Sequence, residues 1–390
     1  MEGEGDSEVE KTFMEEQSIL DKYRAAADIA DEAVKMISEK LLVGADIATL
    51  CQEGDNFIEE KCLTVFHSKK TKKLRRGVAF PTSVSVNYIL GNYSPLKDES
   101  SLIQEGDIAK IDLGVHIDGY IAISGHTVFV AADKNAKVTG RAADIMLAAH
   151  AAKEAALRTI LAGNKNTQVT EVINQAAEGF KCKVVKGVFS HKLKKHVIDS
   201  DDVIASTRGQ KCDMYEFHHG DVFGLEIFIS TGSGKPKQSE LKTTIYKRRP
   251  ENTYLLKSDK ARGFLKQVNN KYPSLPFSLR AFDDQTMVRI GVKHCVDHEL
   301  IEPFTVVEEE KSELVAHWKA TVAVLANGTV LLSGNLPFDE SRYETDNKIE
   351  AQGLKDLLAV SMDLKDQKKR KKPTEKSTKE DVKVNEEEKK

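Results

Sequence analysis

The sequence predicts an α+β fold built from two related halves, and three observations predict it. Apolar residues recur at helical spacing in 19–37 and again in an alanine-rich stretch near 136–161. Strand-like segments follow the helices in each half, and one pair of them at 110–130 reads as a hairpin. The halves also share a short motif, which indicates a pseudo-twofold relation between them.

The first half begins with two predicted helices. The apolar residues of 19–37 fall on one face of a helix, and a second helix is predicted at 47–62, directly after Asp46. Strand-like segments follow at 77–90 and in the hairpin at 110–130, where apolar residues predominate. This half is therefore expected to place a pair of helices against a sheet.

The second half repeats this order. The alanine-rich helix at 136–161 is followed by a Gly-Asn break and a further helix at 168–180. Strand-like segments follow at 184–188 and 221–229. The order helix, helix, strands thus occurs twice along the chain.

The motif shared by the halves places one carboxylate in each. Gly-Asp precedes a strand in both EGDIAKIDLGV (105–115) and HGDVFGLEIFI (219–229), and an acidic residue follows that Asp by five positions. These acidic residues are Asp112 and Glu226. A pattern this short also arises by chance. If it marks a true repeat, the two carboxylates meet at the centre of the molecule.

Residues 237–308 interrupt the second half and are interpreted as an inserted module, with a helix predicted at 258–270. Strand character returns at 314–325 and 329–334, and a short helix is predicted at 353–360. The predicted organisation is an acidic, disordered tail at 1–14, a main domain at 15–236 and 309–360, the insert at 237–308, and a Lys/Glu-rich, disordered tail at 361–390.

Composition limits the classes of function. The 390 residues are 40% hydrophobic and 31% charged, as in a soluble globular protein, and no apolar run approaches the ~20 residues of a membrane span. The N-terminus lacks the apolar core of a secretory signal. The cysteines are five, widely spaced and without a CxxC pair, which favours a reducing compartment: cytoplasm, nucleus or both.

The net charge is only −3, so affinity for nucleic acid must come from local clusters of cations. Such clusters bind phosphate backbones without reading bases, but they are also found as solvated surface or as nuclear-localisation signals. With 6% aromatic residues, sequence-specific reading of single strands is not expected. The candidate RNA-binding residues are Lys69, Lys70, Lys72, Lys73, Arg75 and Arg76; Lys247, Arg248 and Arg249 in the insert; and Lys368, Lys369, Arg370, Lys371 and Lys372 in the tail.

Five segments taken together resemble the type II methionine aminopeptidases. They are FPTSVSVN (80–87), KIDLGVHIDGYI (110–121), SHKLKKHVID (190–199), GLEIFISTGSGK (224–235) and VAHWKATVAVL (315–325), in the same order along the chain. The resemblance covers roughly residues 15–360 and implies the pita-bread (creatinase/methionine aminopeptidase-like) fold, with a small helical module inserted in its second half. The chain is more similar still to a non-peptidase branch, the proliferation-associated or ErbB-binding proteins.

The resemblance also implies where a metal site would lie. The peptidases hold two divalent ions with five side chains, whose positions match Asp112, Ile123, His191, Glu226 and Lys319 in this chain. The position of their substrate-contacting His matches Asn92. Three of the five metal-ligand positions are therefore retained and two are replaced.

The replacements predict a pseudoenzyme without metal or other cofactor. Ile123 offers no lone pair, and Lys319 brings a cation to a position where an anion bridges two metal ions. At ~4 Å and an effective dielectric of ~20, this contact costs several kcal/mol. We expect the Lys319 ammonium to lie between Asp112 and Glu226 and to satisfy both. The alternative is a degenerate single-metal site at Asp112, His191 and Glu226.

The resemblance implies a role in binding RNA and ribosomes. Members act in ribosome biogenesis, translation control and growth regulation, and move between nucleolus, nucleus and cytoplasm, while the peptidases work near the exit tunnel of the large subunit. Two alternatives are a residually active metallo-aminopeptidase and a transcription or signalling adaptor. For the adaptor, Leu354, Leu357 and Leu358 fit an LxxLL partner helix, although an amphipathic helix packed on its own domain has the same pattern. A monomer is expected.

Overall fold

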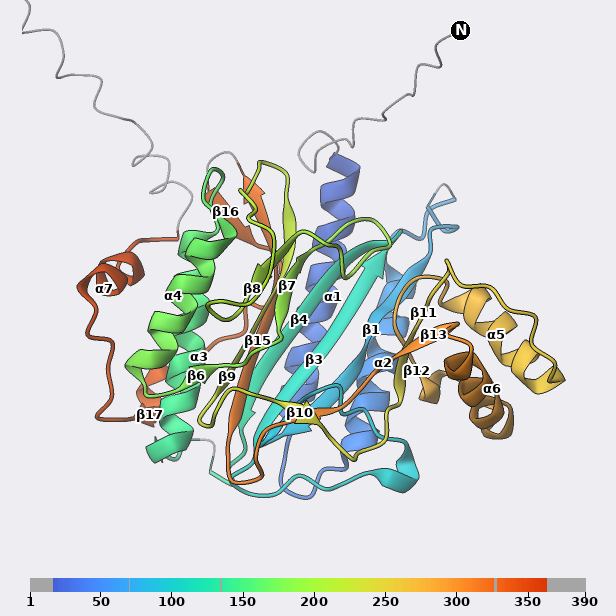
Figure 1. Ribbon diagram of the computed structural model, residues 1–390, viewed down its shortest axis with the longest axis horizontal. Coiled ribbons are helices and arrows are strands. Elements are labelled where there is room, and N and C mark those ends of the chain that lie inside the picture. Colours follow the sequence, from blue (N-terminus) through green and yellow to red (C-terminus); the bar gives the residue numbers. More distant parts are fainter. Residues whose placement is uncertain (1–16, 70, 134, 326–327, 363–390) are drawn as a thin grey trace, which may run out of the picture.

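A computed structural model describes residues 17–69, 71–133, 135–325 and 328–362. The two tails predicted at 1–14 and 361–390 lie outside the described residues, apart from 361 and 362. The described chain is organised around one large antiparallel sheet with helices packed against it (Figure 1). Its main strand order is β1-β3-β4-β15-β9-β7-β8, with β16 beside β15 and β6 beside β9. None of the described helices is long and apolar enough to cross a membrane.

The first half follows the sequence prediction closely. Asp46 caps the second helix by accepting a hydrogen bond of 2.8 Å from the Thr49 N–H. The elements are α1 (Gln17–Lys40), α2 (Ile47–Thr64), β1 (Arg76–Val86), β2 (Ile89–Gly91), a 3-10 turn (Lys97–Glu99), β3 (Ile108–Ile117) and β4 (Tyr120–Phe129). The hairpin predicted at 110–130 is β3 and β4, which pair along their full length.

The second half repeats two helices and strands. The predicted helix at 136–161 begins only at Gly140, because residues 138–139 form a strand with the C-terminal region. Its elements are β5 (Val138–Thr139), α3 (Gly140–Thr159), α4 (Asn166–Gly179), β6 (Lys183–Val184), β7 (Phe189–Lys192), β8 (Val203–Ala205) and β9 (Val222–Ser230). After the insert come β15 (Val315–Leu325), β16 (Gly328–Leu331), a 3-10 turn (Glu340–Arg342), β17 (Tyr343–Glu344) and α7 (Gln352–Leu358).

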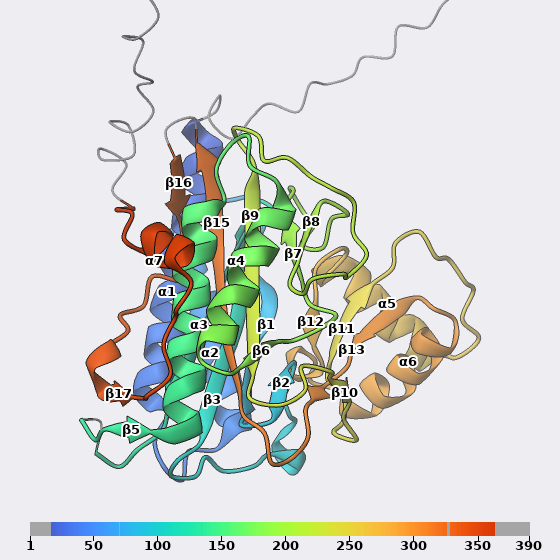
Figure 2. The ribbon, with the colours of Figure 1, turned by 60° about the vertical axis from the view of Figure 1, so that its left-hand side comes forward.

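Between β9 and β15 the chain leaves the main sheet and forms a small module with its own aromatic core. Its elements are β10 (Lys237–Gln238), β11 (Ile245–Arg248), α5 (Asp259–Lys271), β12 (Phe277–Ser278), a 3-10 turn (Leu279–Ala281), α6 (Gln285–Asp297), β13 (Ile301–Phe304) and β14 (Val307–Glu308). The module is not purely helical, since β12, β11 and β13 form a three-stranded sheet beside the helices (Figures 1 and 2). The helix α6 was not predicted.

Two apolar clusters cover the halves of the main sheet. One joins α1 and α2 to β1, β3 and β4, and the other joins α3 and α4 to β9 and β15. Each helix pair therefore buries one half of the sheet, as the pseudo-twofold prediction requires. The halves meet where β4 pairs with β15, at Gly125 opposite Lys319.

Candidate functional site

Four neighbouring strands carry one row of residues across the seam between the halves. Asp112 on β3 lies opposite Gly125 on β4, and Gly125 lies opposite Lys319 on β15. Lys319 in turn lies opposite Glu226 on β9. Residues opposite one another in antiparallel strands project to the same face, so the two carboxylates of the repeated motif and the lysine converge.

The Lys319 ammonium lies between the two carboxylates. Its Nζ is 3.0 Å from Oδ2 of Asp112 and 3.4 Å from Oε1 of Glu226. The same Nζ lies 4.8 Å from the centre of the Phe80 ring, within the range of a cation–π contact. Only 7% of the Lys319 side chain is exposed, so the two anionic partners offset the cost of burying the cation.

The charges in this row stabilise one another. Burial works against ionisation of Lys319, but Asp112 and Glu226 raise its pKa above the ordinary value. Burial also works against ionisation of Glu226, yet Lys319 and the nearby His317 ring lower the pKa of Glu226 to about 2. For Asp112, burial raises the pKa and Lys319 only partly counteracts it. Asp112 and Glu226 together therefore hold Lys319 charged at neutral pH.

His317 is part of this site, although the sequence motifs did not single it out. Its Nε2 lies 3.5 Å from Oε1 of Glu226, and its ring is stacked on Phe228 with the ring centres 4.0 Å apart. It precedes Lys319 by two residues on β15, and residues spaced by two share a face of a strand. That spacing was the signal available in the sequence.

Gly125 makes room for the lysine. A Cβ at this position would lie 2.8 Å from Cβ of Lys319 and 3.0 Å from Cε1 of His317, closer than carbon atoms pack. We therefore expect Gly125→Ala to lower the free energy of unfolding by about 1–3 kcal/mol, measured by urea denaturation.

The matched control for this prediction is Gly353→Ala on α7. A Cβ there would meet no atom within 4 Å, and alanine favours a helix, so this variant should be neutral or slightly stabilised. Equal stabilities of Gly125→Ala and the wild-type protein would show that the strands at the seam are less tightly packed than the geometry indicates.

Ile123, at the other replaced position, is part of an apolar cluster. It packs with Ala79, Ile121 and Leu275, and Leu275 comes from the inserted module. A Cβ on Gly224 would lie 2.5 Å from Cδ1 of Ile123, so the isoleucine also depends on a glycine in β9. Apolar side chains therefore surround the position that the resemblance matches to an acidic ligand of the peptidases.

The remaining positions implied by the resemblance are committed to backbone contacts. The Nδ1 atom of His191 on β7 lies 2.8 Å from the Ser200 carbonyl oxygen. Asn92, just after β2, donates its side-chain N–H to the Thr305 carbonyl at 3.0 Å. The structure therefore brings Asp112, Glu226 and Lys319 together in one row. Asn92 instead contacts Thr305, between β13 and β14 of the inserted module.

This arrangement does not fit the two-metal site of the peptidases. Bridging carboxylates must face two cations, but here they already face the Lys319 ammonium. Ile123 contributes no donor atom. Within the described residues, no group of three His, Cys, Asp or Glu side chains is arranged to hold a metal ion.

The basic segment before β1 is largely exposed. Lys70 lies outside the described residues. The exposed members are Lys69, Lys72, Lys73 and Arg75. Arg76 differs from these, because its guanidinium donates to the carbonyls of Phe66, at 2.9 Å, and Val65. Arg76 thus holds the loop together, and its contact with RNA stays a prediction.

The basic residues of the insert also have partners within the fold, and their contact with RNA stays a prediction. Arg248 is only 6% exposed and donates to backbone carbonyls of its own module. Lys247 forms an ion pair with Asp199, and Arg249 pairs with Glu302 at 2.8 Å. Internal partners therefore occupy these three cations, which the sequence alone placed among the RNA-binding candidates. The cations at 368–372 lie outside the described residues.

The LxxLL helix packs on its own domain. Leu354 is 2% exposed, and Leu357 and Leu358 pack against the cluster formed by α3 and α4. Arg158 fixes the end of this segment by donating to the Val360 carbonyl at 2.8 Å. The contacts therefore support the packed amphipathic helix, which was the alternative to a free partner helix.

Comparison with known proteins identifies close relatives. Residues 21–258 match the model of metallopeptidase family M24. The chain is 41% identical over 314 residues to ErbB-3 binding protein 1 of Solanum tuberosum, an alignment that covers 80% of each protein. A solved structure of a thermophilic Arx1 has a TM-score of 0.82 and 28% identity, and covers 89% of this chain and 99% of its own.

A methionine aminopeptidase structure from Thermotoga maritima is more distant. It has a TM-score of 0.54 at 16% identity and covers 82% of this chain and 98% of its own. Identity this low supports the fold alone. Together with the family match, it confirms the pita-bread fold that the sequence motifs implied.

Proposed function

The chain belongs to metallopeptidase family M24, in the branch of the ErbB-3 binding proteins, and we propose that it is an inactive member that binds RNA and the large ribosomal subunit. It acts there near the exit tunnel, in ribosome biogenesis, translation control and growth regulation. Its proposed locations are the cytoplasm, nucleus and nucleolus, and its proposed state is a monomer. In this proposal the chain retains the surface that docks on the ribosome and has lost the peptidase activity.

The position of Lys319 carries the proposal of inactivity. An aminopeptidase of this family needs metal ions to activate water and to polarise the scissile carbonyl. In this chain an ammonium lies 3.0 Å from Asp112 and 3.4 Å from Glu226, which would repel any divalent ion placed between them. Among the residues that the structure describes, no side chain at the site replaces the lost metal ligands, so no step of peptide hydrolysis is supported.

The same geometry argues against a single-metal site. Such a site would use Asp112, His191 and Glu226, but Lys319 already pairs with both carboxylates. His191 uses one ring nitrogen for a backbone contact, so it could supply only a single ligand atom. The insert further contributes Leu275 to the apolar cluster around Ile123, beside the same row.

The proposal of RNA binding rests on the resemblance and on exposed, unpaired cations. In the loop between α2 and β1, the described cations Lys69, Lys72 and Lys73 are exposed and form no ion pair with described residues. Lysines of this kind bind phosphates by charge and by release of counterions, without base specificity. Arg75 donates to the Asn270 carbonyl of the insert, and Arg76 donates to the Phe66 carbonyl at the start of the loop.

Cosedimentation with purified large ribosomal subunits tests this function. We expect wild-type binding to weaken steeply with salt, and Lys69→Gln, Lys72→Gln, Lys73→Gln to flatten the log–log salt slope by about 2, at ~0.7 per phosphate contact. A variant truncated after residue 362 measures how much the C-terminal tail contributes to subunit binding.

The control for this experiment has the same change of charge elsewhere. It combines Lys35→Gln, Lys97→Gln and Lys348→Gln, whose lysines are exposed and form no ion pair within the described chain. Failure of the wild-type protein to sediment with subunits or RNA would overturn the function. A loop variant that behaves like this control would remove only the loop from the interface.

The two alternatives predict different results. A residual peptidase would bind cobalt, manganese or zinc in stoichiometric amount and would cleave Met-peptides. An adaptor would retain protein partners after nuclease treatment and lose them when Leu357 and Leu358 are changed. The packing of those leucines against α3 and α4 argues against their use as a partner helix by an adaptor.

A further inference from the structure

A basic pocket lies in the second half of the molecule, away from the row at the seam. Its volume is about 500 Å³, within the range of small-ligand sites. Three segments line it: 181–186 with β6, 207–209 after β8, and 233–235 after β9, together with residues of α4. The cations are spread over these segments, so no run of basic residues marks the pocket in the sequence.

The pocket has an excess of positive charge. Its charged lining residues are Lys181, Lys183, Lys186, Arg208, Lys235 and Glu178. Arg208 pairs with Glu171 at 2.8 Å and with Glu178, which neutralises part of this set. The four lysines are exposed, and none of them pairs with a carboxylate among the described residues. These four ammonium groups are free to meet an anionic partner.

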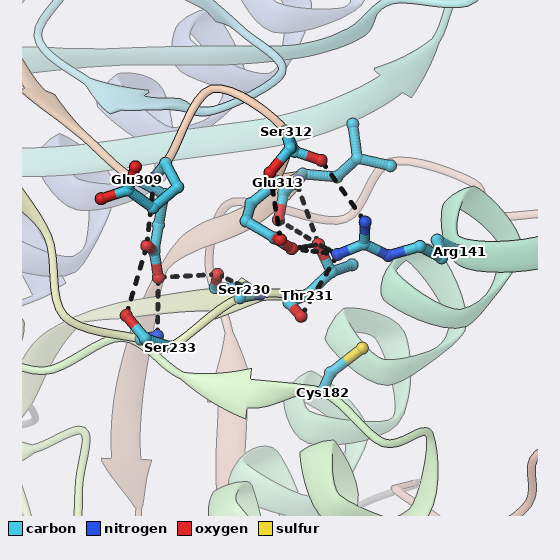
Figure 3. A network of polar contacts seen from close by, with 12 residues as sticks. Arg141, Cys182, Ser230, Thr231, Ser233, Glu309, Ser312 and Glu313 are labelled. Carbon is cyan, nitrogen blue, oxygen red and sulfur yellow. Dashed lines mark hydrogen bonds and ion pairs between the residues drawn. The ribbon is translucent and has the colours of Figure 1, made fainter.

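One wall of the pocket is the loop that follows β9, and polar contacts to Glu309 and Arg141 hold this loop in place (Figure 3). The carboxylate of Glu309, only 1% exposed, accepts hydrogen bonds from the Ser230 hydroxyl at 2.9 Å and the Gly234 N–H at 2.6 Å. Beside it, Arg141 donates to the Thr231 hydroxyl at 2.6 Å. A buried, satisfied carboxylate of this kind orders the backbone that carries Lys235.

The loop is also bound to the segment opposite. The Lys186 N–H donates to the Gly234 carbonyl at 2.8 Å. Gly234 has a φ of +70°, and a Cβ there would lie 2.7 Å from the Val184 carbonyl oxygen. Only glycine allows this close approach, which brings Lys235 to the same pocket as Lys183 and Lys186.

We propose that this pocket is a binding site for the phosphate backbone of RNA. The inference rests on the proposed function and assigns to it a contact surface that differs from the 69–76 loop. Flexible lysines around a fixed concave surface suit a phosphate chain, because they supply charge without selecting bases. Asn174, Thr207 and Ser233 add uncharged polar side chains to the same lining.

The pocket and the 69–76 loop belong to different halves of the sheet. The loop leads into β1 at one end of the strand order, whereas the pocket lies beside β6 and β9. The strands β1 and β9 are separated by β3, β4 and β15, which corresponds to about 19 Å at ~4.8 Å per strand. Changes at the two surfaces should therefore have additive effects on RNA binding.

The test is the combined change Lys183→Gln, Lys186→Gln, Lys235→Gln. Binding is measured by fluorescence anisotropy with labelled oligouridine over a salt series, and by cosedimentation with large ribosomal subunits. We expect the log–log salt slope to flatten by about 2, at ~0.7 for each lost contact. The Lys35, Lys97, Lys348 control should retain the wild-type slope. The three corresponding Lys→Arg changes should retain it as well.

The possible outcomes distinguish a failure of the pocket assignment from a failure of the proposed function. If the wild-type protein binds oligouridine and subunits but the pocket variant matches the control, the pocket assignment is overturned and the function stands. If the wild-type protein binds neither, both are overturned. If the pocket variant loses affinity for polyglutamate but not for oligouridine, the pocket takes an acidic protein segment and the RNA assignment is wrong. Circular dichroism verifies that all variants are folded.

Discussion

Replacing Lys319 with methionine is expected to lower the free energy of unfolding at pH 7 by about 3–5 kcal/mol, because two buried carboxylates lose their cation. In the wild-type protein the ammonium is 3.0 Å from Asp112 and 3.4 Å from Glu226, and it is 7% exposed. Methionine has a similar volume, so packing is largely kept while the charge is removed. Urea denaturation measures the effect.

Removing all three charges provides the control. The combination Lys319→Met, Asp112→Asn, Glu226→Gln leaves no uncompensated buried ion, so most of the lost stability should return. If the single variant is as stable as the wild-type protein, the lysine does not neutralise the carboxylates and the electrostatic explanation of this site fails. If the triple variant stays as unstable as the single one, packing rather than charge governs the effect.

The single variant Lys319→Met should reverse the pH dependence of the free energy of unfolding. In the wild-type protein the pKa of Glu226 is about 2, below its unfolded value of ~4.3, so its contribution is present above ~4.3 and is lost as the pH falls towards 2. Without Lys319, burial raises the carboxylate pKa values above their unfolded values, and the variant is destabilised as the pH rises past ~4. The stability difference between the two proteins should therefore be large at pH 7 and small near pH 3. A difference independent of pH would contradict this account.

Rebuilding the missing ligands is expected to create divalent-metal affinity. The double variant Ile123→Asp, Lys319→Glu restores acidic residues at both replaced positions beside Asp112 and Glu226. We expect Mn²⁺ to stabilise this variant, by about 2.7 kcal/mol at a concentration 100 times the dissociation constant, and to leave the wild-type protein unchanged. Thermal denaturation with and without Mn²⁺ measures the gain, and titration calorimetry gives the stoichiometry.

The control for the rebuilt site is the same double variant with Asp112→Asn added. Loss of one carboxylate ligand should remove most of the Mn²⁺ stabilisation, whereas nonspecific binding to surface carboxylates would persist. Stoichiometric Mn²⁺ binding by the wild-type protein, abolished by Asp112→Asn, would sink the proposal that Lys319 replaces the ions.

Much of the fold could be predicted from local patterns. The apolar spacing in 19–37 and 47–62 located α1 and α2 to within three residues, because helix periodicity is written in neighbouring residues. The repeated Gly-Asp motif located β3 and β9 and their carboxylates. The sheet and second helix of the insert were missed, since their short apolar segments acquire a face only through the module's own core.

The roles of the basic residues could not be predicted in the same way. Arg76, Arg248 and Lys69 are chemically similar in the sequence, yet the first two bind backbone carbonyls inside the fold and only the third is free at the surface. Burial and pairing of a cation depend on groups far away along the chain. For the same reason, the lysines of the basic pocket were not recognised as one surface.

By itself, the sequence determined that two of the positions matched to metal ligands carry an isoleucine, which has no donor atom, and a lysine, which has the wrong sign of charge. The tertiary structure alone decided what these side chains contact. Lys319 and Asp112 are 207 residues apart, and only the strand pairing at the seam brings the ammonium within 3.0 Å of the carboxylate. Side-chain chemistry is a property of each residue, whereas electrostatic compensation depends on distances that only the folded chain fixes.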